Sequence, residues 1–157
     1  MAMTMQDLRT LCDGLRVPSQ LVPDGSALLI NADGVVIALE LIDEGRVFDM
    51  NVLNFAKCPG DSPHRNAVAA LLCELNSRTR CVRYAWIPAH GAIYLRSEVF
   101  LIESKLSEAQ FIEYVRGLVA WYHRSNARVQ KLVETGTDPG DPVAQQQTAP
   151  AEPMNKL

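Results

Sequence analysis

The chain has 157 residues, of which 48% are apolar, and a formal net charge of −3 at pH 7. This length suits one domain with an ordinary core, and the mild acidity disfavours a nucleic-acid surface built on clustered Lys and Arg. The apolar runs are much shorter than the ~20 residues that span a bilayer. MAMTMQDLR at the start lacks the basic lead of a secretory signal, so we expect a cytoplasmic protein without membrane or nucleic-acid partners.

In chain order, the first predicted element is a short amphipathic helix within residues 4–17, with Thr4 as its cap and Asp7 in its first turn. Prolines punctuate an extended link after it. A three-strand meander follows, with Gly-containing turns at 32–34 and 43–45. Its strands are expected at residues 26–31, 35–42 and 46–55.

The second half predicts a helix, a hairpin and a longer helix. Ser62-Pro63 can supply the cap and first-turn proline of a helix that runs to about Asn76. Residues 81–101 alternate with a period of two around a turn at Gly91, which is typical of a hairpin. Ser107 and Gln110 fit a capping box, so a helix begins there. Gly117, inside this helix, indicates close approach to a partner backbone.

Residues 135–157 are rich in Pro, Gly, Gln and Thr, which predicts a disordered tail after a domain spanning residues 4–134. The domain is α+β, with an antiparallel five-stranded sheet and three helices in the order αβββαββα.

This order and several local patterns resemble the bacterial YbjN-like family, which shares its fold with the type III secretion chaperones. The resemblance covers roughly Met5 to Lys131 and rests on patterns of apolar residues and turns. The matching stretches are PDGSALLINADGVVIALELIDEGRVFDMNVL, VAALLCELN, VRYAWIPAHGAIYLRSEVFL and LSEAQFIEYVRGLVAWYHR.

The resemblance implies a non-enzymatic homodimer that binds other polypeptides, and it carries over no catalytic residues and no cofactor. Secretion chaperones are usually more acidic and end soon after the last helix, so the YbjN-like branch fits this chain better.

The second helix is apolar over more of its circumference than one sheet covers, which is typical of a protein contact. We therefore predict a symmetric dimer. The alternative is that the first or third helix covers this surface within one subunit. The predicted interface residues are Ala67, Val68, Leu71, Leu72 and Trp86.

Arg83, Tyr94 and Arg96 form a polar, aromatic face of the hairpin that could contact a peptide, although a plain solvated face has the same pattern. His123 and Arg124 could bind an anion or a partner carboxylate, or could simply meet the negative end of the helix dipole. Asp138 and Asp141 lack the pattern of a calcium loop and are expected in turns.

The four cysteines are widely spaced and form no C-x-x-C pair, so we expect reduced, buried thiols at Cys12, Cys58, Cys73 and Cys81. A zinc site made by the last three with His64 matches no short knuckle. A nucleophilic Cys58 paired with His64 or His90 lacks any sign of an oxyanion site. No metal or catalytic site is expected.

These observations favour a chaperone-like or regulatory module that binds a segment of another protein, by strand addition or helix docking. Two other hypotheses stay open. One is a small-molecule sensor or enzyme with a pocket between the sheet and the third helix. The other is a structural role in which the tail acts as a tether.

Overall fold

The computed structural model describes residues 2–101 and 104–143. The described residues form three helices and six strands. They are α1 (Met5–Gly14), β1 (Ser19–Leu21), β2 (Ala27–Ala32), β3 (Val35–Ile42), β4 (Val47–Lys57), α2 (Arg65–Arg78), β5 (Arg83–Ile87), β6 (Ala92–Phe100) and α3 (Glu108–Thr135).

All neighbouring strands pair antiparallel, in the order β1-β2-β3-β4-β6-β5. The predicted α+β class is therefore confirmed, but the prediction of five strands was wrong by one. The additional strand, β1, has only three residues and lies in the proline-punctuated link. Its residues pair with Leu28–Ile30, so the free edge of β2 creates a strand where the sequence has too few residues for a periodic signal.

The predicted turns have the backbone that their sequences require. Asp33 and Gly34 both have positive φ, of 51° and 77°, which is the conformation of a two-residue type I′ hairpin turn. Gly45 has a φ of +81°, and a Cβ there would lie 2.1 Å from the backbone oxygen of Met3. Only glycine therefore lets the N-terminal segment approach this turn.

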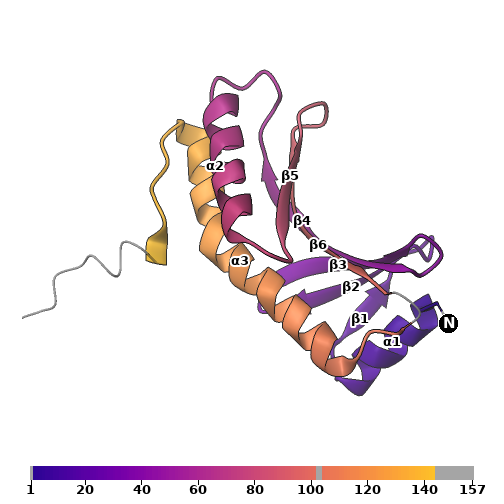
Figure 1. Ribbon diagram of the computed structural model, residues 1–157. Coiled ribbons are helices and arrows are strands. Elements are labelled where there is room, and N and C mark those ends of the chain that lie inside the picture. Colours follow the sequence, from indigo (N-terminus) through magenta and orange to yellow (C-terminus); the bar gives the residue numbers. More distant parts are fainter. Residues whose placement is uncertain (1, 102–103, 144–157) are drawn as a thin grey trace, which may run out of the picture.

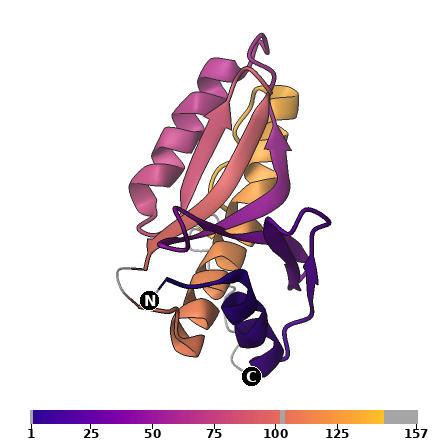
Figure 2. The same cartoon turned by 90° about the vertical axis from the view of Figure 1, so that its right-hand side faces the viewer.

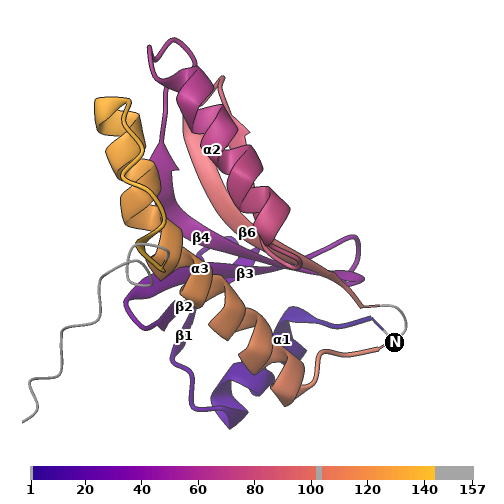
Figure 3. The same ribbon diagram turned by 60° about the vertical axis from the view of Figure 1, so that its left-hand side comes forward.

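The core lies between one face of the sheet and the helices, as Figures 1 and 3 show for α2 and α3. Strand residues that point inward alternate with residues on the other face. Phe48, Met50 and Leu95 are each 0% exposed, and Leu8 of α1 and Phe111 of α3 belong to the same cluster. One continuous core thus joins the N-terminal and C-terminal helices.

The capping predictions for α1 and α3 are confirmed, and the prediction for α2 is corrected. Thr4 and Ser107 each close a capping box. The helix α2 begins at Arg65, after His64, and has no side-chain cap hydrogen bond. The Ser62 hydroxyl accepts from the His64 N–H at 3.2 Å, so the serine and proline form a turn before the helix.

The helix α3 spans 28 residues and is capped at its C-terminal end by Gly136, whose φ of 72° is left-handed. A Cβ on Gly136 would lie 2.4 Å from Nδ1 of His64, so this glycine also brings the start of α2 against the end of α3. None of the described helices is both long enough and apolar enough to cross a bilayer.

Candidate functional site

The face of the sheet that points away from the core carries the polar residues of β4, β5 and β6. In Figure 2 this part of the sheet lies in front of α3. Inward residues such as Tyr84, Met50 and Leu95 are buried, and their neighbours along each strand point the other way. We call this surface the outer sheet face. It comprises Asp49, Asn51, Arg83, Ala85, Tyr94, Arg96 and Glu98.

The three predicted partner-binding residues lie together on the outer sheet face. Arg83 is directly opposite Arg96 in the register of β5 and β6, and Tyr94 is opposite Ala85. Glu98 lies between the two arginines: it forms an ion pair with Arg96 at 2.6 Å and another with Arg83. The like charges on neighbouring strands are thereby compensated.

Asp49 of β4 completes this charged network. Its carboxylate lies 3.0 Å from the Arg96 guanidinium, and the residue is only 4% exposed. Burial raises the pKa of Asp49, although the hydrogen bond and charge of Arg96 act in the opposite direction. The neighbouring Asn51 has a buried Oδ1 without a hydrogen-bond partner among the described residues.

Exposed apolar side chains flank the charged network. At one end, Ile42 and Phe100 lie on either side of the buried Val47 in a row across β3, β4 and β6. Phe100 is 73% exposed and Ile42 is 40% exposed. At the far end of β5, Ile87 is 41% exposed. Aromatic and aliphatic side chains around a compensated charge pair are typical of a protein contact surface, and this face carries no convergent reactive groups.

The sequence prediction missed Asp49, Glu98 and Phe100. Alternation within residues 46–55 already places Asp49 on the wetter side of its strand. The pairing of β4 with β6 brings Asp49 to Arg96. Because α2 and β5 lie between these two strands in the sequence, no local sequence pattern predicts the pairing. Phe100 had a local signal, since it alternates with Val99 and Leu101 at the end of its strand.

Most of the residues predicted for a dimer interface are covered within the single chain. The exposed fractions of Val68, Leu71 and Leu72 are 0%, 4% and 5%, because α2 packs against β5 and α3. This is the alternative in which the third helix covers the apolar surface of α2. Ala67 is exposed and Trp86 is half-buried, with its indole N–H donating to the Cys58 carbonyl at 2.8 Å.

The candidate thiol residues differ in their exposure to solvent. Cys58 is buried, whereas Cys73 and Cys81 are exposed, which corrects the expectation of four buried thiols. Across residues 2–101 and 104–143 there is no group of three or more His, Cys, Asp or Glu side chains that could hold a metal ion. Burial raises the pKa of the Cys12 thiol to about 11, so this residue is protonated and unreactive at neutral pH.

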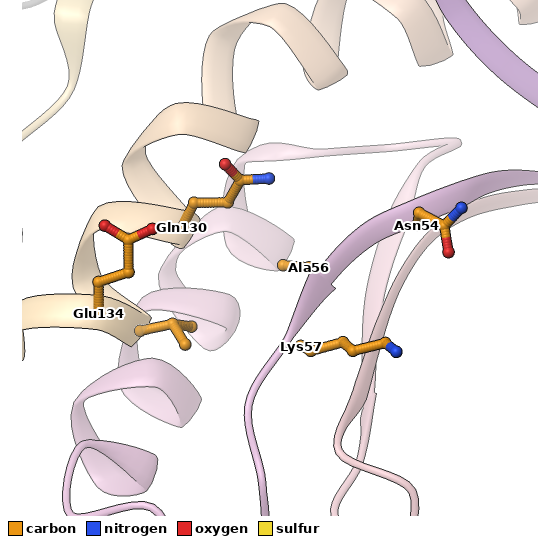
Figure 4. A pocket seen from close by; sticks show the side chains of 6 residues that line it. Asn54, Ala56, Lys57, Gln130 and Glu134 are labelled. Carbon is orange, nitrogen blue, oxygen red and sulfur yellow. The ribbon is translucent and has the colours of Figure 1, made fainter.

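Two hollows lie between the sheet and α3. One, of about 390 Å³, separates the end of β4 from Gln130 and Glu134 of α3 (Figure 4). The other, of about 420 Å³, is lined by Tyr114, Gly117 and Trp121 of α3 and by Cys81. A Cβ at Gly117 would meet no atom within 4 Å, so no backbone of the described chain approaches this glycine.

No protein-family model matches the chain, and no curated protein matches it. Several solved structures are similar to it, including the following three. YbjN, a proposed transcription regulator from E. coli, gives a TM-score of 0.62 at 16% identity over 84% of this chain and 93% of that chain. The ExsC–ExsE complex gives 0.56 at 13% identity, over 83% of this chain and 98% of that chain.

The HopA1–SchA chaperone–effector complex gives a TM-score of 0.51 at 13% identity, over 73% of this chain and 85% of that chain. Each match extends over most of both chains, and each TM-score is above 0.5. The chain therefore has the YbjN-like, type III secretion chaperone-like fold.

Proposed function

We propose that the protein is a non-enzymatic binding module that holds a segment of another protein on its outer sheet face. The single observation that carries this proposal is the flank of exposed apolar side chains beside a compensated charge network, with Phe100 73% exposed. An exposed aromatic side chain of this size is a typical anchor of a protein interface. The similarity to the ExsC–ExsE and HopA1–SchA complexes supports a binding role.

The two edges of the sheet differ in their ability to accept a partner strand. At β5, the Asn76 side chain of α2 donates to the Tyr84 carbonyl at 3.0 Å and accepts from the Tyr84 N–H at 2.7 Å. These two hydrogen bonds occupy the edge where a peptide would pair. We therefore expect the partner segment to lie across the outer sheet face or against β1, at the other edge.

The proposal is tested by capture of partners with the full-length tagged protein from the cytoplasm of its source cell. Phe100→Ser should lose a partner that the wild-type protein retains. Ile112→Ser is the matched control, because Ile112 is an exposed apolar residue of α3, 38% exposed, outside the outer sheet face. A partner that both variants retain equally would contradict the assignment of this face.

We further propose that the module acts as a homodimer, in which exposed Ala67 and half-buried Trp86 contribute to the contact. Sedimentation at micromolar concentration should give twice the mass of one chain, and Ala67→Arg should restore the monomer because it places a charge in the contact. A wild-type monomer at this concentration would contradict the dimer.

A second candidate function is that of a small-molecule sensor, favoured by the hollow at Gly117. Its volume of about 420 Å³ lies in the range of ligand pockets, and Tyr114 and Trp121 offer aromatic surfaces. Gly117→Leu would fill this space, so it should abolish ligand-induced stabilisation in a thermal-shift screen. A screen without any stabilising ligand would remove this candidate.

A further inference from the structure

The chain turns back after α3 and lies along it. The helix ends at Thr135 and is capped by Gly136, and residues 137–143, the C-terminal segment, run beside α3 on its side away from the sheet (Figures 1 and 3). Two aspartates of this segment, Asp138 and Asp141, contact arginines of α2 and α3. The structure therefore contains a peptide-like segment seated on a basic surface.

The contacts are those of carboxylates recognised by guanidinium groups. Arg128 donates to Asp138 through Nε at 2.7 Å and through Nη2 at 2.6 Å, a bidentate pair. Asp141 accepts from Arg78 at 3.0 Å and also from Arg124. These hydrogen bonds lower the pKa of both Asp138 and Asp141, so both carboxylates are ionised at neutral pH.

The three arginines are oriented by groups other than the segment. Glu74 lies 2.9 Å from the guanidinium of Arg78 and 3.3 Å from that of Arg128, which is only 7% exposed. The guanidinium of Arg124 lies 5.0 Å from the ring centroid of Trp121, a cation–π contact. These contacts come from α2 and α3, so the segment does not supply all the partners that orient the arginines.

The segment does not fill this surface. A space of about 440 Å³ remains between it and α3, lined in part by His123 and Lys131. Lys131 has no ion pair among the described residues. Without the segment, the carboxylate of Glu74 would be the only ion-pair partner that this lysine and the three arginines have among the described residues, so the charge of this surface favours an anionic occupant.

We propose that this basic surface is a docking site for an acidic, extended segment of a partner protein, and that the chain's own Asp138 and Asp141 occupy it in cis. It lies on the other side of α3 from the sheet, so it is independent of the partner proposed for the outer sheet face. Only Gly136 and Thr137 separate the helix from Asp138. The tethered segment therefore competes at a local concentration of about millimolar or more, and a partner has to displace it.

The test uses the full-length protein and a fluorescent peptide that copies residues 137–143, with binding followed by anisotropy. Asp138→Asn combined with Asp141→Asn should release the segment, which NMR relaxation at Gly140 detects. The released variant should bind the peptide, and the wild-type protein should bind it at least about tenfold more weakly because its own segment competes. Raised salt should weaken this binding.

Two further variants, made in the released protein, locate the site. Arg124→Gln should weaken peptide binding about tenfold, the effect of one charge-assisted hydrogen bond. Arg116→Gln is the matched control, since its exposed pair with Glu113 lies elsewhere on α3, and it should change nothing. Phe100→Ser should also leave this binding intact, which separates the site from the outer sheet face.

Three outcomes would overturn the proposal. The first is a released variant that does not bind the peptide. The second is equal binding of a control peptide with both aspartates replaced by asparagine, because charge would then play no part. The third is a segment that stays docked in the double variant, since the arginines would then not be what holds it.

Discussion

At the scale of single residues, Asp49 shows how the site combines burial with charge. Its carboxylate is nearly inaccessible, yet it lies beside Arg96 on the outer sheet face. Burial of a charge costs free energy that the ion pair offsets only in part, and the raised pKa of Asp49 reflects this balance. Asp49 therefore holds the Arg96 side chain in place, at a cost to the stability of the folded protein.

The pH dependence of stability tests this account. A pKa that is raised in the folded protein means that the folded state binds the proton more tightly, so stability falls as the pH rises from the unfolded pKa, about 3.9, through the folded pKa. The Asp49→Asn variant lacks this loss of stability, because an asparagine side chain does not titrate. The unfolding free energy of the variant, measured with urea, should therefore increase relative to wild type as the pH rises above about 4.

Asp43→Asn is the control for this comparison, because the Asp43 side chain is exposed in a surface pair with Arg46. A difference between Asp49→Asn and wild type that stays constant with pH, or that changes in the opposite direction, would contradict the burial argument.

At the scale of elements, α2 and β5 hold each other through polar as well as apolar contacts. The Asn76 side chain hydrogen-bonds both backbone groups of Tyr84. The Tyr84 hydroxyl in turn donates to Ser125 of α3 at 2.8 Å, and burial raises the pKa of Tyr84 to about 12. One edge residue thus connects the sheet to two helices.

Asn76→Ala should lower the unfolding free energy by about 1 to 3 kcal/mol, because it leaves the N–H and C=O of Tyr84 without partners. Urea unfolding measures this loss. Asn66→Ala is the matched control, because Asn66 is exposed in the first turn of the same helix. A loss no larger than that of the control would mean that water replaces Asn76 at the strand edge.

At the scale of the whole molecule, the fold sorts the four cysteines into two classes. Cys12 and Cys58 are buried, whereas Cys73 and Cys81 are exposed. Their positions along the chain do not indicate this division. The division arises because Cys73 lies on an uncovered face of α2 and Cys81 lies in the exposed part of the loop before β5.

Alkylation of the native protein should therefore modify Cys73 and Cys81, and Cys12 and Cys58 should react only after unfolding. The pKa of about 11 further protects Cys12, because the thiolate is the reactive form. Peptide mass spectrometry identifies the modified residues. Equal labelling rates for Cys12 and Cys81 in the native protein would contradict this arrangement of the fold.

The arginines of the basic docking surface and the aspartates bound to them were predicted in part from the sequence. The sequence marks Arg124 as a residue that could bind a carboxylate, and it places Asp138 and Asp141 in turns. Both expectations hold, since each aspartate accepts a backbone N–H two residues ahead. The sequence did not predict the contacts of these aspartates with the arginines, because residues 135–157 are expected to form a disordered tail. Residues 144–157 lie outside the described part of the chain.

The sequence by itself determined the α+β class, the hairpin turns, the helix cap at Thr4, the capping box at Ser107 and the common face of Arg83, Tyr94 and Arg96. These depend on side-chain periodicity and on backbone preferences that act over a few residues. Only the tertiary structure revealed the pairing of the sixth strand with β2 and the packing of α2 against β5 and α3. The same holds for the ion pair of Asp49 with Arg96 and for that of Asp138 with Arg128. Each of these joins groups far apart in the chain or completes a free edge, so only the packed chain brings the partners together.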